Sequence, residues 1–212
     1  MLPSLALLGI GLLLGMRHAV DPDHVVAVTT IVSRQPSLAR ASAIGALWGV
    51  GHTGTILLLG GAIILFRIAI PPRLGLAMEL AVAIMLIVLG LLNLSGRTLS
   101  GMQSALRPLL VGFVHGLAGS AFVAMLVVAA IPQPLMGVAY LLTFGLGTIT
   151  GMVLVTVAIA TPSVFAAKRF SHVQRYLRVA SGVVSIAFGI FLAHEVSIVH
   201  GLFTSTPTWT PK

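Results

Sequence analysis

Long apolar stretches alternate with short polar connections along almost the whole chain. A helix needs about 20 mostly apolar residues to cross a bilayer, and six stretches meet that length. They lie near 3–32, 38–66, 74–95, 108–131, 134–161 and 174–199. We therefore predict an all-α, polytopic integral membrane protein with six transmembrane helices, forming a single transmembrane domain over residues 1–212.

The composition supports this prediction. Hydrophobic residues make up 58% of the chain and charged residues only 8%, whereas about a quarter of a soluble domain is charged. The first apolar stretch lacks a preceding basic segment and an evident cleavage site, so we expect it to stay in the mature chain rather than act as a signal peptide. The absence of cysteine excludes disulfides and thiolate metal ligands.

The basic residues predict the orientation in the membrane. Loops that expose Lys and Arg usually face the cytoplasm. The connections after the first, third and fifth stretches contain Arg34, Arg40, Arg97, Arg107, Lys168, Arg169, Arg175 and Arg178, whereas the others and the C-terminus contain Arg67, Arg73 and Lys212. We expect a multi-pass protein of the cytoplasmic membrane with both termini outside. Because the charges do not cluster on a soluble face, we expect no nucleic-acid binding.

The two halves of the chain resemble each other. Residues 12–28 align with 109–125, 48–63 with 144–159, and 87–92 with 186–191. With three spans in each copy, the second copy would be inverted relative to the first. We predict two inverted three-helix repeats, near 1–96 and 105–200, followed by an exposed tail at 201–212. Inverted repeats are typical of transporters that bind their substrate near the middle of the membrane.

Scarce polar residues gather in the first apolar stretch, in the sequence RHAVDPDHVV. His18, Asp21, Asp23 and His24 lie within seven residues there, and ionisable residues inside a span are expensive and usually functional. Pro22 should interrupt the helix, because proline lacks a backbone donor and disfavours helix in the residue before it. A continuous helix would place His18 and His24 about 240° apart, so the break is needed if both bind one ion.

Imidazole and carboxylate without thiolate suit borderline divalent ions. Such ligands favour Ni²⁺ or Cu²⁺, and Co²⁺ or Zn²⁺ could also bind. His52 in GVGHTGT completes the predicted metal ligands. Further candidates for the site or its pathway are His115, Ser120 and Thr53, and Arg17 is a candidate supporting charge. The alternatives are an ion-pair network with Arg17 and purely structural roles for His52 and His115.

The spacing His18-x4-Asp23-His24 resembles the H-x4-D-H signature of the nickel/cobalt transporter family, NiCoT or NicO. Gly51–Thr53 is similar to that family's Gly-His-Ser/Thr motif on the following helix. The short length and His115–Ser120, HGLAGS, resemble the six-span, UreH-like branch. The resemblance implies uptake of Ni²⁺ or Co²⁺ and roles in ion recognition for His18, Asp21, Asp23, His24 and His52.

We therefore predict a secondary transporter whose substrate is Ni²⁺ or Co²⁺, with the bilayer and the ion as partners. Homo-oligomerisation stays open. No P-loop is present, and we expect no organic cofactor. Longer members of the family carry acidic motifs where this chain has the neutral Gly116–Ser120. This difference leaves efflux, or metal delivery to urease or hydrogenase maturation without independent transport, as alternatives. A metalloenzyme is disfavoured because HExxH is absent and the remaining carboxylates, Glu79 and Glu195, look peripheral.

Overall fold

The computed structural model describes residues 2–33, 35, 37–66, 70–96, 106–117, 131, 133–169 and 171–209. The described part contains seven α-helices and a short π-helical segment, η2, and no strand. Their bounds are α1 Leu2–His18, α2 Pro22–Val32, α3 Leu38–Phe66, α4 Pro72–Ser95, α5 Leu106–His115, α7 Pro134–Arg169, α8 Ser171–His194 and η2 Glu195–Val199.

Several of these helices are long and apolar enough to cross a membrane. Four meet the requirement alone, within α3, α4, α7 and the α8–η2 segment, and the bent pair of α1 and α2 is a fifth candidate. The predicted fourth span falls on α5 and on residues 118–130, which lie outside the described part. The protein is thus an all-helical, multi-pass membrane protein.

The first span is interrupted between α1 and α2, the place where Pro22 predicts a break. Helix α1 ends at His18 and α2 begins with Pro22, and their axes differ by 55°. Asp21 has extended backbone, with φ −59° and ψ 145°, as the residue before a proline prefers. Pro22 suits the first helical position because the missing N–H has no partner there in any helix. The break therefore follows from local sequence.

Two predicted spans end differently in the structure. Helix α7 continues past residue 161, through Pro162, to Arg169. The hydroxyl of Thr161 donates to the carbonyl of Val157 at 2.7 Å, so this turn keeps hydrogen bonds beside the proline. Helix α5 ends at His115 and is followed by a turn at Gly116 and Leu117, within the span predicted over 108–131.

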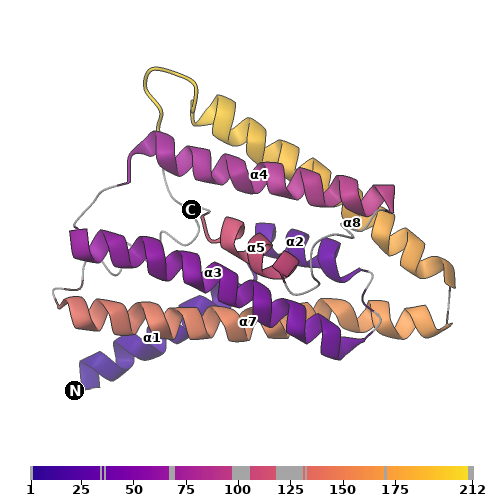
Figure 1. The fold of residues 1–212 in the computed structure, drawn as a ribbon, viewed down its shortest axis with the longest axis horizontal. Coiled ribbons are helices and arrows are strands. Elements are labelled where there is room, and N and C mark those ends of the chain that lie inside the picture. The colour runs from indigo at the N-terminus through magenta and orange to yellow at the C-terminus, as the bar shows by residue number, and fades with distance from the viewer. Residues whose placement is uncertain are drawn as a thin grey trace.

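The long helices pack in two layers with the short helices between them (Figure 1). Helices α3 and α7 pack antiparallel and form one layer with α1, and α4 and α8 form the other. Helices α2 and α5 lie between these layers, where α2 contacts α4, α7 and α8 and α5 contacts α3 and α4. The break in the first span thus lies inside the molecule.

Helix α2 is tied to the second layer by buried hydrogen bonds. Thr30 Oγ1 donates to the carbonyl of Ser181 at 3.3 Å, and Asn93 Nδ2 donates to Ser181 Oγ at 2.9 Å and to Ser33 Oγ at 3.3 Å. Buried polar groups of this kind need partners. These bonds fix the position of the half-helix that follows Pro22.

Close helix contacts recur at matched positions of the two halves. A Cβ on Gly15 would meet the carbonyl oxygen of Phe144, and one on Gly112 would meet that of Trp48. Small residues let helix backbones approach this closely. The same reciprocity relates other pairs of contacts: Gly51 to Leu109 and Gly147 to Leu12, Gly49 to Ile149 and Gly145 to Thr53, and Gly90 to Ile186 and Gly189 to Ile87.

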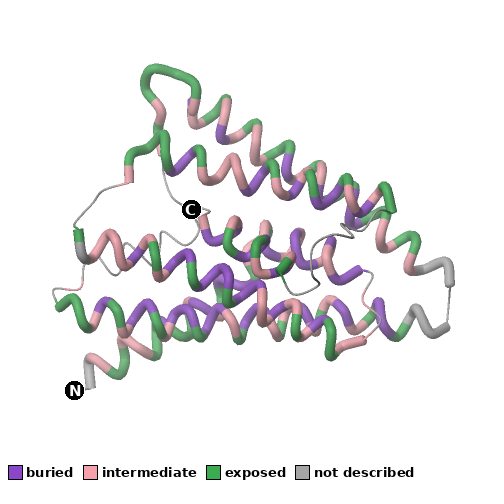
Figure 2. The backbone as a smooth tube through the Cα atoms, viewed as in Figure 1, coloured by how far each residue is buried: buried purple, intermediate pink, exposed green. Residues whose placement is uncertain are grey.

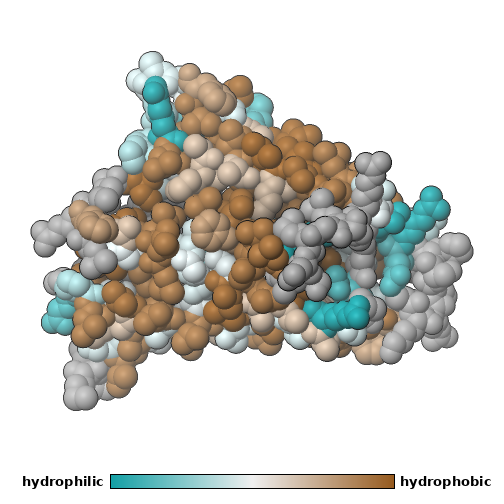
Figure 3. Space-filling model, in the orientation of Figure 1, coloured by the Kyte–Doolittle hydropathy of each residue, from teal (hydrophilic) through white to brown (hydrophobic). Residues whose placement is uncertain are grey.

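The larger cluster of buried apolar residues lies where α2, α3, α4, α5 and α7 meet, and buried positions appear purple in Figure 2. The outer surface is the reverse of a soluble protein, with large apolar side chains exposed, including Leu135, Leu58 and Val184. Hydrophobic side chains cover most of the face seen in Figure 3, and hydrophilic side chains gather near its ends. This distribution matches a surface that faces lipid along its middle.

The C-terminal segment folds back onto the start of α4. Trp209 Nε1 donates to Glu79 Oε1 at 2.8 Å, and Arg73 donates to the carbonyl of Thr204 at 3.1 Å. The indole also lies against Gly75, where a side chain would collide with it. Glu79 is therefore engaged at the periphery, away from the polar centre of the molecule.

Candidate metal centre

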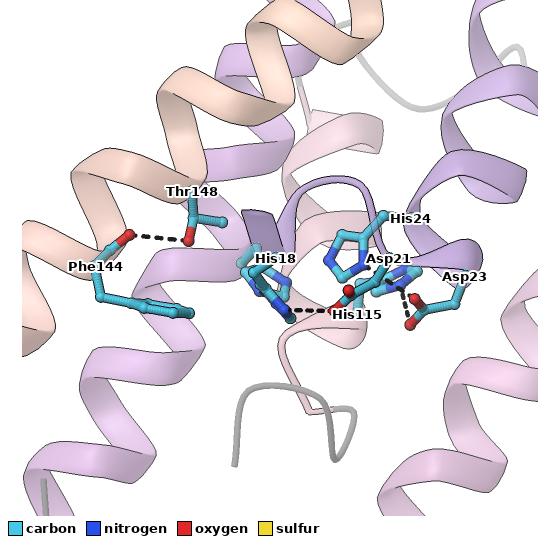
Figure 4. A network of polar contacts seen from close by, with 8 residues as sticks. His18, Asp21, Asp23, His24, His115, Phe144 and Thr148 are labelled. Carbon is cyan, nitrogen blue, oxygen red and sulfur yellow. Dashed lines mark hydrogen bonds and ion pairs between the residues drawn. The ribbon is translucent and has the colours of Figure 1, made fainter. Parts of the chain in front are cut away.

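Four histidines converge at the break in the first span. His18 is the last residue of α1, His24 lies in the first turn of α2, His52 stands at the middle of the 29-residue helix α3, and His115 ends α5. His24, His52 and His115 are fully buried and His18 is 6% exposed. Figure 4 shows the labelled imidazoles together with Asp21 and Asp23. The structure thus brings the predicted metal ligands into one cluster and adds His115.

The first group that could hold a metal ion contains only imidazoles. His18, His24 and His52 each offer a ligand nitrogen, and these atoms all lie within 4.8 Å of one another. The Nε2 atoms of His18 and His52 are 2.9 Å apart. Two nitrogens bound about 2.0–2.1 Å from one metal at tetrahedral or right angles would be separated by about 2.9–3.4 Å. The distance between the two nitrogens therefore matches that between two ligands of one ion.

The two carboxylates orient these imidazoles. Asp21 Oδ2 accepts from His18 Nδ1 at 2.8 Å, and Asp23 Oδ1 accepts from His24 Nδ1 at 3.1 Å. A carboxylate that holds the Nδ1 proton leaves Nε2 with its lone pair, an arrangement common among metal-bound histidines. His24 Nε2 has no hydrogen-bond partner in the described part. Both aspartates therefore prepare Nε2 of a neighbouring histidine for an ion.

A second group contains a carboxylate and joins the two halves of the chain. Asp23 Oδ2 accepts from His115 Nε2 at 2.9 Å, and Asp23, His24 and His115 offer ligand atoms within 4.8 Å of one another. The rings of His24 and His115 are 4.3 Å apart between centroids. The sequence placed His115 only among the further candidates, because its neighbours in the chain are neutral.

Trp48 forms a wall of the cluster and was missed in the sequence. Its indole stacks on His24 at 5.6 Å between ring centroids and meets the edge of His115 at 5.4 Å. Phe144, which aligns with Trp48 in the repeat, lies 5.6 Å from His18 between ring centroids. Both aromatics are buried and exclude water from the imidazoles. A usable signal was present, since Trp48 precedes His52 by one helical turn.

Three further candidate residues of the site, Thr53, Arg17 and Ser120, are not among the residues that the structure places in the two possible metal-binding groups. The hydroxyl of Thr53 donates to the carbonyl of Gly145 on α7 at 3.2 Å, so it serves the α3–α7 contact. Arg17 is exposed, and in the described ranges no ion pair joins it to Asp21 or Asp23. Ser120 lies outside the described residues.

The donor set determines which ions the centre could hold. Four imidazoles and two carboxylates without thiolate suit Ni²⁺, Co²⁺, Cu²⁺ or Zn²⁺ better than hard ions such as Mg²⁺. Ring nitrogens of His24, His52 and His115 are buried without a hydrogen-bond partner among the described residues. Unpaired buried groups are costly, and coordination of a cation by His24 would satisfy its Nε2.

Fold and cluster together define a class: a multi-pass helical membrane protein with a buried centre that could hold a metal ion. Comparison with known proteins narrows this class. The chain is 33% identical over 219 residues to the urease accessory protein UreH of Bacillus sp. (strain TB-90), with 94% of this chain and 95% of that protein covered. The chain belongs to the UreH family.

More distant relatives are two chloroplast proteins of Arabidopsis thaliana, FOR GROWTH AND FERTILITY 2 and 1. Each is 26% identical to this chain, over 205 and 210 residues respectively, and the matches cover 85% of the chain. The chain spans only 54% and 56% of those two proteins. No protein-family model and no solved structure matches the chain.

Proposed function

We propose that the protein is a secondary transporter that moves a divalent transition-metal ion, Ni²⁺ or Co²⁺, across the cytoplasmic membrane. The observation that carries the proposal is the group of His18, His24 and His52, buried where a broken helix meets the middle of α3. Ionisable side chains at that depth usually mark an ion pathway. Membership of the UreH family, whose named relative serves urease, agrees with a metal cargo.

The proposed architecture is six spans in two inverted repeats. Its support is the set of reciprocal contacts, in which Gly15 meets Phe144 and Gly112 meets Trp48. Helix ends also match, since α1 ends at His18 and α5 at the aligned His115. Two inverted halves can rock about a site between them and so expose it to each side in turn.

The proposed mechanism assigns separate tasks to the ligands. The ion loses most of its water at the break, where imidazole nitrogens of His18, His24 and His52 replace it. Asp21 and Asp23 hold the imidazoles in position through the bonds described above and offset part of the ion's charge. The half-helix α2 carries Asp23 and His24, so movement of α2 together with α4 and α8, to which it is hydrogen-bonded, would open the site.

Uptake into proteoliposomes tests the transporter directly. The purified protein is expected to accumulate Ni²⁺ or Co²⁺ in preference to Mn²⁺, and parallel assays with Zn²⁺ and with an imposed pH gradient define selectivity and coupling. His18→Ala and Asp23→Ala should abolish uptake at equal reconstitution, whereas Glu79→Gln, at the periphery, should not. Unchanged uptake in both site variants would refute the proposal.

The name of the UreH relative supports a second candidate function, delivery of metal to a maturation system without independent transport. In that case the purified protein would bind Ni²⁺ but move none across a liposome membrane. Cells lacking the protein would lose urease activity, and added Ni²⁺ would not restore it. Uptake by the protein alone decides for the transporter.

A further inference from the structure

We propose that the centre offers the ion two alternative positions that share His24. The first is formed by His18, His24 and His52. The second is formed by Asp23, His24 and His115. The inference relies on the proposed function only for the cargo, a divalent transition-metal cation.

His24 can serve both positions because its two ring nitrogens have different surroundings. Nδ1 lies 3.1 Å from Asp23 Oδ1, in the group with His115, whereas Nε2 has no partner among the described residues and remains for the imidazole group. The ring is 4.6 Å from that of His18 and 4.3 Å from that of His115 between centroids. Each position would therefore use its own ring nitrogen of the same imidazole.

The two positions exclude each other. A neutral imidazole has one lone pair and one N–H. An ion at the first position binds His24 Nε2, so the ring proton must be on Nδ1, which donates a hydrogen bond to Asp23. An ion at the second position binds Nδ1, so the ring proton must be on Nε2. One chain therefore holds one ion, distributed between two environments.

The positions also differ in what they connect. Ligands of the first come from α1, α2 and α3, all in the first half of the chain, whereas the second joins Asp23 and His24 on α2 to His115 on α5. In the structure the Asp23–His115 hydrogen bond of 2.9 Å already makes this link. An ion at the second position would hold α2 and α5 together through its ligands. With an ion at the first position, α2 and α5 would be joined only by the Asp23–His115 hydrogen bond.

Binding of Co²⁺ to the purified full-length protein in detergent tests the inference. Visible absorption of bound Co²⁺ reports its ligand field, and the spectra of the two single variants serve as references for the two environments. The wild type should bind one ion per chain in two environments. His115→Gln should retain only the first environment and His52→Thr only the second. Threonine is chosen because Thr148 fills the aligned, buried position of α7, and His200→Gln, outside the cluster, is the control.

Affinities provide a second criterion. If the two positions are about equally filled, loss of one lowers the affinity for Co²⁺ only about twofold. Loss of both in the double variant should lower it more than about 100-fold, far beyond the product of the two single effects. A loss above about tenfold in either single variant would indicate one joint site, since removing support from a single site typically costs 10–100-fold. That result would overturn the inference.

Two safeguards keep the test decisive. If neither variant folds, the wild-type spectrum decides alone, because a single cobalt environment contradicts the inference and two environments support it. The titration needs no transport. A protein with two environments that moves no ion in liposomes would refute the transporter and keep the inference, and active uptake with one environment would do the opposite.

Discussion

In the proposed mechanism, Asp21 acts on the ion through His18 rather than as a ligand of the imidazole group. Its carboxylate accepts from His18 Nδ1 at 2.8 Å, and its side chain is 32% exposed. Asp21→Asn should leave the fold intact, because a partly exposed amide is tolerated. In the His115→Gln background, where only the first position remains, it should weaken Ni²⁺ binding about 10–100-fold, the usual cost of removing a carboxylate behind a metal-bound histidine. Titration of the purified variant with Ni²⁺ measures this change.

Glu79→Gln is the matched control for Asp21→Asn. Glu79 is also acidic and lies within the apolar helix α4, but it accepts from Trp209 rather than from a histidine of the centre. Its neutralisation should leave Ni²⁺ affinity within about twofold, since it orients none of the proposed ligands. Equal effects of the two substitutions would mean that only the overall negative charge matters, contrary to the orienting role of Asp21.

Acidification should weaken ion binding. Protonated imidazole has no lone pair, so each ligand histidine must be neutral to bind, and binding at low pH displaces protons. Ni²⁺ affinity should therefore be highest at the alkaline end of the range and fall as the pH drops. Titrations between pH 8 and 5.5 in one detergent would measure it. A flat profile would argue against imidazole ligands.

Among the residues of the centre, the local ligands were predictable and the distant partners were not. His18, Asp21, Asp23 and His24 lie within seven residues, so a single break could bring them together. The bond between Asp23 and His115 joins residues 92 apart in the chain. It depends on how α2 and α5 pack between the layers, which neither residue's sequence neighbourhood specifies.

Among the elements, the contact of α1 with α7 depends on a glycine. A Cβ on Gly15 would collide with the backbone of Phe144, whereas one on Gly9 of the same helix would meet nothing within 4 Å. Gly15→Ala should destabilise the protein by about 1–3 kcal/mol, the usual cost of overpacking, and Gly9→Ala should not destabilise it. Thermal unfolding of both variants in the same detergent compares them.

The aligned contact of α5 with α3 provides an independent repetition. A Cβ on Gly112 would collide with the carbonyl of Trp48, while Gly54 on α3 has open space. Gly112→Ala should therefore behave as Gly15→Ala does, and Gly54→Ala as Gly9→Ala does. A destabilised Gly15 variant beside an unaffected Gly112 variant would contradict the proposed equivalence of the two halves.

The sequence predicted where the long helices lie more accurately than where they end. Hydrophobic length predicts α3 and α4 to within two residues, because a run of apolar residues must match the bilayer. The extension of α7 through Pro162 to Arg169 was missed, since a proline usually signals an end, although packing can preserve a helix around it. The end of α5 at His115 lies within the predicted span 108–131, at the position that aligns with the end of α1 at His18.

For the whole molecule, more of the basic residues at helix starts lie at one end than at the other. Figure 1 shows the start of α3 and the start of α8 at one end of the molecule and the start of α4 at the other. Arg40, Arg175 and Arg178 lie near the first end, and Arg73 lies at the second. Basic residues near helix ends usually stay in the cytoplasm. We therefore propose that the end with α3 and α8 starts is cytoplasmic.

The absence of cysteine from the sequence allows a direct test of this orientation. Ser205→Cys lies in the C-terminal segment and Ala39→Cys at the start of α3, and both positions are outside the buried core. A membrane-impermeant maleimide should label Ser205→Cys in intact cells and Ala39→Cys only after permeabilisation, because the proposed topology separates them by the bilayer. The unmodified chain, which has no thiol, is the background control. Labelling of Ala39→Cys alone in intact cells would invert the topology, and with it the side from which the proposed transporter takes up its ion.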